Sequence, residues 1–196
     1  TVFIWVFKII VNVLRCRASL RYMVIRDTVL LGDPRLREIA DPIYDYEKEL
    51  RPVLEDLKDT LTEHQRLYKM GRGLAAPQIG HNKRVVYVQT EAFTGYLVNP
   101  SIVYKSPETF DVWDSCFSMN AEFFVKIPRH RRIKIKYTDQ FSEFHNDTFT
   151  DDLSELMQHE IDHLDGIVCS DHLTNMQNIA MRAEWEKRYR VKGVGM

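Results

Sequence analysis

Residues 150–166, TDDLSELMQHEIDHLDG, decide the fold that the sequence predicts. Apolar residues recur here at helical spacing, and Thr150 or Asp151 is a suitable N-cap residue. The stretch contains H-E-x-x-H, with His159 and His163 one turn apart on the same face of the predicted helix. We therefore expect a helix that presents two imidazoles to one metal ion.

The residue after the first histidine favours a catalytic site. On a helix, Glu160 lies about 100° round from His159, where its carboxylate can accept a proton from a water molecule at the metal. H-E-x-x-H also arises by chance on exposed helices that bind no metal. Leu153, Leu156 and Met157 are expected to bury one flank of this helix, so the histidines would face an interior cleft.

The sequence offers three candidates for the third metal ligand. Cys169 stands where metzincin proteases place their third histidine, in H-E-x-x-H-x-x-G-x-x-H, and Gly166 supplies the turn of that pattern. Glu184 lies downstream, as the glutamate ligand of thermolysin-like enzymes does, whereas Cys116 lies far upstream in VWDSCFSMN. Spacing alone does not choose among them, and Cys169 is also consistent with a small buried hydrophobic residue.

The segments around this helix predict an α+β fold. Leucines and Tyr68 recur at helical spacing from residue 50 onward, with Pro52 in the first turn, and residues 175–190 predict a last polar helix. Five segments rich in β-branched and aromatic residues predict strands: 84–90, 96–104, 123–128, 132–139 and 144–150. Because the strands are gathered in the middle of the chain, we expect antiparallel or mixed sheets around a central helix that carries H-E-x-x-H.

The composition is that of an ordinary globular protein. A chain of 196 residues is long enough for one domain with a sizeable core. The net charge of −1 gives no reason to expect specificity for nucleic acid. Three cysteines are too few for a disulfide framework, and their odd number fits a reducing compartment or metal ligation.

The first 26 residues differ from the rest, because they carry five basic residues and no acidic one. Four polar positions at helical spacing form one stripe on an otherwise apolar segment: Lys8, Asn12, Arg15 and Ser19. This pattern is typical of organelle-import segments, and the apolar run is too short to span a bilayer. A secretory signal and a helix packed on the domain are the alternatives. We expect residues 1–26 to be a targeting segment and residues 27–196 to be a single catalytic domain.

Three motifs resemble those of the peptide deformylase family. GRGLAAPQIG at 71–80 is similar to G-x-G-x-A-A-x-Q, and DSCFS at 114–118 is similar to E-G-C-L-S. QHEIDHLDG at 158–166 matches Q-H-E-x-D-H-L-x-G. The motifs lie in the family's order, and the resemblance covers roughly residues 21 to 190. It implies the fold of that family.

The resemblance also implies a complete active site. It assigns three metal ligands: Cys116, His159 and His163. It makes Glu160 the general base and then the general acid. The side-chain amide of Gln78 and the backbone N–H of Phe117 would stabilise the oxyanion that forms on the formyl oxygen. The implied metal is Fe(II), with Zn(II), Ni(II) or Co(II) as substitutes, which suits a Cys-His-His ligand set.

The resemblance implies a substrate-binding surface as well. Its residues would be Gly71, Arg72, Gly73, Leu74, Ser115 and Leu156. Small residues in the first motif allow the peptide backbone to approach closely.

The sequence departs from the family pattern around this surface. Asp114 replaces a glutamate that the family pairs with an arginine, for which Arg129 is the expected partner. Ser115 replaces a glycine, and Arg72 stands where the family often has an apolar residue lining the methionine pocket. Glu155 adds a carboxylate near that pocket. These changes spare the predicted ligands and bear on substrate recognition.

We expect a metal-dependent hydrolase that removes the N-formyl group from the initiator methionine of nascent polypeptides. The alternatives are a divergent enzyme acting on other formyl or acyl peptides, an H-E-x-x-H protease that uses Cys169, and a metal-stabilised binding protein without catalysis. We expect a monomer that contacts the ribosome transiently, has no direct nucleic-acid specificity and has no membrane span. Formylated initiation and the basic leader together favour a mitochondrion, with another organelle of bacterial origin or the cytoplasm as alternatives.

Overall fold

The computed structural model describes residues 24–190 of the chain. The predicted leader lies outside the described residues except for residues 24–26. Of these, Val24 and Arg26 donate backbone hydrogen bonds to Asp59 and Thr60.

The chain forms eight strands and three α-helices within the described residues. The strands are β1 (Gly73–Ala75), β2 (Val85–Gln89), β3 (Thr94–Lys105), β4 (Thr109–Asp114), β5 (Phe123–His130), β6 (Arg132–Thr138), β7 (Phe144–Thr150) and β8 (Ile179–Met181). The α-helices are α2 (Arg51–Tyr68), α3 (Asp151–Leu164) and α4 (Arg182–Arg188). Shorter helical turns are η1 (Pro34–Arg37), η2 (Tyr46–Leu50), η3 (Ala76–Ile79), η4 (Phe117–Met119), η5 (Cys169–His172) and η6 (Met176–Asn178).

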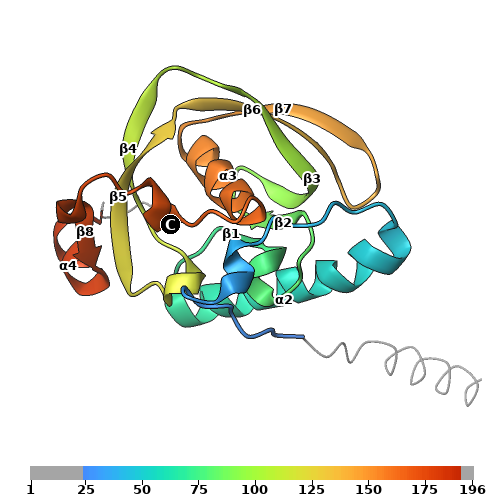
Figure 1. Ribbon diagram of the computed structural model, residues 1–196, viewed down its shortest axis with the longest axis horizontal. Coiled ribbons are helices and arrows are strands. Elements are labelled where there is room, and N and C mark those ends of the chain that lie inside the picture. Colours follow the sequence, from blue (N-terminus) through green and yellow to red (C-terminus); the bar gives the residue numbers. More distant parts are fainter. Residues whose placement is uncertain (1–23, 191–196) are drawn as a thin grey trace, which may run out of the picture.

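The strands form two antiparallel sheets. One sheet has the order β1-β2-β3-β6-β7, and the other has the order β4-β5-β8. The helix α3 lies in the middle of the molecule and contacts strands of both sheets, including β1, β5 and β7 (Figure 1). The predicted α+β fold, with antiparallel sheets around the H-E-x-x-H helix, is confirmed.

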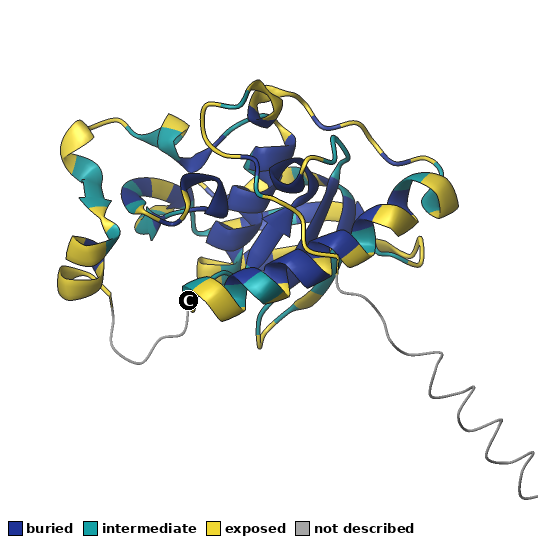
Figure 2. Cartoon of the chain, turned by 90° about the horizontal axis from the view of Figure 1, so that it is seen from below, coloured by how far each residue is buried: buried dark blue, intermediate teal, exposed yellow. Residues whose placement is uncertain are grey.

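Burial explains why α3 occupies the centre. Its residues Leu156, Met157, Ile161 and Leu164 belong to one apolar cluster with the inward side chains of the five-stranded sheet. The side of α2 that faces the core is likewise buried, whereas its outer side is exposed (Figure 2). This burial places the histidine-bearing face of α3 inside the molecule, as the sequence predicts.

One prediction of secondary structure needs correction, and some strands were not predicted. The polar helix predicted for residues 175–190 is wrong in its first half, where η6 and β8 precede the short helix α4. The reason is tertiary, because residues 179–181 pair with residues 123–125 of β5. Strands β1 and β4 were not predicted, although β1 pairs with β2 and β4 pairs with β5 along its whole length. Pro52 does lie in the first turn of α2, as expected.

No helix within residues 24–190 is long and apolar enough to cross a membrane.

Candidate metal centre and active site

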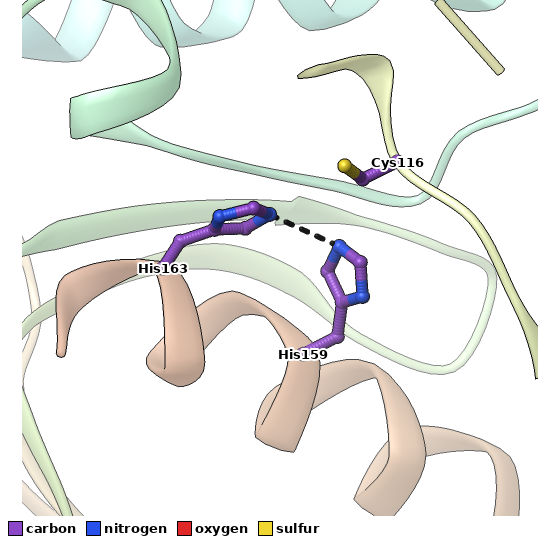
Figure 3. Close-up of side chains that lie close together, drawn as sticks. All are labelled: Cys116, His159 and His163. Carbon is purple, nitrogen blue, oxygen red and sulfur yellow. Dashed lines mark hydrogen bonds between the residues drawn. The ribbon is translucent and has the colours of Figure 1, made fainter. Parts of the chain in front are cut away.

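Three buried side chains converge on one point between α3 and η4. The ligand atoms of Cys116, His159 and His163 all lie within 4.8 Å of one another. The Nε2 atoms of the two histidines are 3.2 Å apart, and the cysteine thiol faces them from the segment that follows β4 (Figure 3). Ligands of one tetrahedral ion are about 3.4–3.8 Å apart when metal–ligand distances are about 2.0–2.3 Å. The group is therefore of the right size and chemistry for a divalent metal ion.

A buried carboxylate orients the first histidine. Oδ1 of Asp114 lies 2.8 Å from Nδ1 of His159, and its other oxygen accepts a 2.9 Å hydrogen bond from Arg129. Although burial favours a neutral imidazole, the Asp114 carboxylate raises the pKa of His159 to about 10. Burial also opposes ionisation of Asp114, but His159 and Arg129 together hold the pKa of its carboxyl below the usual value. With Nδ1 next to Asp114, Nε2 is the nitrogen on the side of His163 and is the one suited to a metal ion.

The predicted general base is buried beside the ligands. Burial raises the pKa of Glu160 to about 7, although the neighbouring His159 and His163 oppose the shift. Its Oε2 is buried and has no hydrogen-bond partner among the described residues. The lack of a side chain at Gly73 leaves space for this carboxylate, since a Cβ built at that position would lie 2.4 Å from Oε1 of Glu160. Such a group can hold or release a proton near neutral pH.

The amide of Gln78 has a fixed orientation. Its Oε1 accepts a 2.9 Å hydrogen bond from the backbone N–H of Ala75. The Nε2 group therefore points the other way, with only a long 3.5 Å contact to the Ser118 hydroxyl. Phe117 is the first residue of η4, so its N–H precedes the intrahelical bonds of that turn. Both residues line the cavity beside the ligand group, as oxyanion donors must.

The cavity encloses about 570 Å³, including its open mouth. Five of the predicted substrate-binding residues line it: Gly71, Arg72, Gly73, Ser115 and Leu156. The sixth, Leu74, does not line it, because its side chain packs in the apolar cluster against α2. The hydroxyl of Ser115 donates to the backbone carbonyl of Phe123 at 2.7 Å. Sequence reasoning missed two aromatic walls, Trp113 on β4 and Phe124 on β5.

The other candidate ligands lie elsewhere or have other partners. Glu184 is on α4, where its half-exposed side chain pairs with Arg188 and Lys187. Cys169 is buried, and its Sγ lies 3.8 Å from Sδ of Met119. Its Sγ lies within 4.8 Å of ligand atoms of Asp114 and His159, but His163 does not belong to that group. Asp114 already forms an ion pair with Arg129.

The two thiols differ in their readiness to ionise. A hydrogen bond from Cys169, together with His163, lowers the pKa of the Cys116 thiol well below its usual value despite burial. The same hydrogen bond and burial raise the pKa of Cys169 well above its usual value. A metal ion binds the thiolate, so Cys116 is the cysteine suited to ligation.

A helix that carries H-E-x-x-H between two antiparallel sheets, with a Cys-His-His group and a carboxylate over an open cavity, defines a metal-dependent hydrolase. The family described as "Polypeptide deformylase" matches residues 25–178. The chain therefore belongs to the peptide deformylase family, the metal-dependent enzymes that remove the N-formyl group from nascent polypeptides.

Relatives and solved structures agree with this assignment. A peptide deformylase of Acidothermus cellulolyticus is 38% identical over 168 residues, which cover 83% of this chain and 89% of the relative. The crystal structure of the Thermotoga maritima peptide deformylase has a TM-score of 0.69 and 31% identity, and the match covers 77% of this chain and 99% of that one. A Met-Ala-Ser-bound peptide deformylase from Acinetobacter baumannii has a TM-score of 0.70 and 26% identity, covering 78% of this chain and 100% of that one.

Proposed function

We propose that this chain removes the formyl group from peptides that begin with N-formylmethionine, using Cys116, His159 and His163 as its metal ligands. The convergence of these three buried side chains, two of which (Cys116 and His159) line an open cavity, carries the proposal. The Acinetobacter baumannii structure with bound Met-Ala-Ser supports the choice of substrate, because that tripeptide is what remains when formyl-Met-Ala-Ser loses its formyl group.

The donor set fits a divalent transition metal. One thiolate and two imidazoles make three protein ligands, the number typical of catalytic rather than structural sites. Cys116, His159 and His163 would hold such an ion, which would supply Lewis acidity toward a carbonyl and toward a water molecule. We propose ferrous iron as the physiological ion, with zinc, nickel or cobalt as substitutes, because a mixed thiolate and imidazole set suits these metals.

Glu160 moves the proton. Its carboxylate takes a proton from the attacking water and then delivers it to the nitrogen of the departing amine. Three features of the structure support this role: its burial, a pKa raised to about 7, and an oxygen without a hydrogen-bond partner among the described residues. A group that ionises near neutral pH can serve in both directions of the transfer.

Gln78 and the N–H of Phe117 stabilise the negative charge that develops on the formyl oxygen. Preorganised donors of this kind are worth about 10²–10³ in rate each. The hydrogen bond from Ala75 holds the Gln78 amide in the donating orientation before substrate arrives. Gln78 and Glu160 line the same cavity, and the formyl carbon, which carries only a hydrogen, is a small group to accommodate there.

We also propose an organellar setting for the enzyme. Formylated initiation belongs to bacteria and their organelle descendants, and the basic, acid-free sequence of residues 1–26 is of the import type. The protein would act as a monomer in a mitochondrion, with transient access to nascent chains at the ribosome. Import of a fusion of residues 1–26 to a fluorescent protein tests the location, and a fusion that stays in the cytosol contradicts it.

Release of formate from formyl-Met-Ala-Ser, by protein purified anaerobically with its metal quantified, tests the function. We expect turnover of the formyl peptide and none of acetyl-Met-Ala-Ser. Glu160→Gln should keep the metal and lose hydrolysis. Cys116→Ser should lose the metal, whereas the matched Cys169→Ser should keep it. No formate release from metal-loaded protein, or metal loss only with Cys169→Ser, would refute the proposal.

A further inference from the structure

The cavity beside the metal ligands continues toward a charged wall. In a formylated peptide the side chain of the first residue branches from the carbon next to the formamide nitrogen. That side chain must therefore occupy the part of the cavity nearest Glu160 and His159. The residues that line the same cavity include Arg72, Glu155 and Leu156, together with Trp113 and Phe124.

Two of these lining residues, Arg72 and Glu155, form a buried ion pair. Nη2 of Arg72 donates to Oε2 of Glu155 at 2.6 Å, and their side chains are only 19% and 9% exposed. The other end of the guanidinium donates to the exposed carboxylate of Asp152 at 2.5 Å. The pair thus joins the segment before β1 to the first turns of α3 across one side of the cavity.

The chemistry of this wall differs from that of the remaining walls. Leu156, Trp113 and Phe124 offer apolar surface to a long, flexible side chain. Seating an apolar end against the Arg72–Glu155 pair displaces water from two charged groups and returns no hydrogen bond. An amide end of the same length can instead accept from the guanidinium and donate to the carboxylate, and hydrogen bonds to charged groups are the stronger ones.

We propose that the Arg72–Glu155 pair sets the specificity of this pocket, so that it accepts uncharged side chains of methionine's length that end in a hydrogen-bonding group, as glutamine does. Methionine remains a substrate through the apolar walls. The inference rests on the proposed deformylation and concerns only the first side chain, not the reaction at the formyl group.

The test uses a length-matched pair of peptides, formyl-Gln-Ala-Ser and formyl-norleucine-Ala-Ser, with formyl-Met-Ala-Ser as the reference. The measured quantity is the ratio of kcat/KM for the glutamine peptide to that for the norleucine peptide. The double variant R72L/E155L replaces the ion pair by apolar side chains and leaves no buried charge unpaired. We expect this ratio to fall about tenfold in R72L/E155L, the factor that corresponds to one lost hydrogen bond.

Two further variants test whether the kcat/KM ratio depends on the polarity of the Arg72–Glu155 pair rather than on the shape of the pocket or on the loss of any ion pair. R72Q/E155Q keeps donors and acceptors on the wall without charge, and it should hold the ratio within about threefold of the original. E47L/R51L removes an exposed ion pair that does not line the cavity, and it should leave the ratio unchanged.

The outcomes distinguish the two proposals. A ratio in R72L/E155L equal to that of the original chain, with formyl-Met-Ala-Ser still cleaved, overturns the specificity inference alone. An equal fall of the ratio in R72Q/E155Q overturns the assignment to wall polarity. If the original chain cleaves none of the three peptides, the proposed function itself is wrong.

Discussion

Gly73→Ala should inactivate the enzyme without emptying its metal site. A Cβ at this position would lie 2.4 Å from Oε1, 2.8 Å from Cδ and 2.9 Å from Cγ of Glu160. Ordinary carbon–oxygen contacts are longer than about 3.3 Å, so the carboxylate would have to move by about 1 Å. A displacement of that size at a reacting group costs about 10²-fold in rate. Gly73 has no unusual backbone conformation, so the loss would come from the carboxylate alone.

Gly95→Ala is the matched control. Gly95 lies in the same sheet, and its added Cβ would meet only the Phe93 ring at 3.7 Å, an ordinary contact. The measurements are kcat/KM for formyl-Met-Ala-Ser, the metal content per chain and the Tm. We expect Gly73→Ala to lose about 100-fold in kcat/KM with full metal content, and Gly95→Ala to match the original chain. Activity of Gly73→Ala within threefold of the original, or loss of its metal, would refute the reasoning.

Three further predictions concern the oxyanion donor Gln78, the carboxylate of Asp114 beside His159, and the effect of His64 on stability. Gln78→Leu should lower kcat by about 10²–10³ with metal content unchanged, measured by formate release. Asp114→Asn should weaken metal affinity by about 10–100-fold in chelator competition, because Asp114 orients His159. Burial lowers the pKa of His64, so the unfolded chain binds the proton more tightly and stability should fall as pH drops below about 6.5. In His64→Gln, the difference in Tm between pH 7.5 and pH 5.5 should shrink, and an unchanged difference would contradict this account.

Local periodicity explains why the centre of the fold could be predicted. The spacing of His159 and His163 lets both imidazoles meet one ion when the segment is a helix, and the apolar residues that precede them, Leu156 and Met157, indicate that this helix is buried. The sequence also predicted α2 and five of the strands from patterns of a few neighbouring residues. Such patterns depend only on residues within one helix or strand, so they can be recognised without knowing how the rest of the chain folds.

Contacts between distant segments could not be predicted in this way. Residues 179–181 resemble part of a polar helix until the edge of β5 offers them backbone partners. Trp113 and Phe124 become cavity walls only because β4 and β5 pair beside α3. The choice of Cys116 over Cys169 from the sequence likewise needed the family resemblance, because only the folded chain brings Cys116 together with both histidines.

The contacts of Asp114 explain how the second motif tolerates an aspartate in place of the family's glutamate. A shorter carboxylate at position 114 keeps its function because its two oxygens divide between His159 and Arg129, both within 2.9 Å. The arginine expected as its partner is therefore confirmed, and the orientation of the metal ligand is preserved. Arg72 pairs with Glu155 and Asp152, whereas Arg129 is the ion-pair partner of Asp114. Because the proposed metal ligands and the Arg72–Glu155 pair are separate side chains, the proposed change of preference for the first side chain is compatible with deformylation.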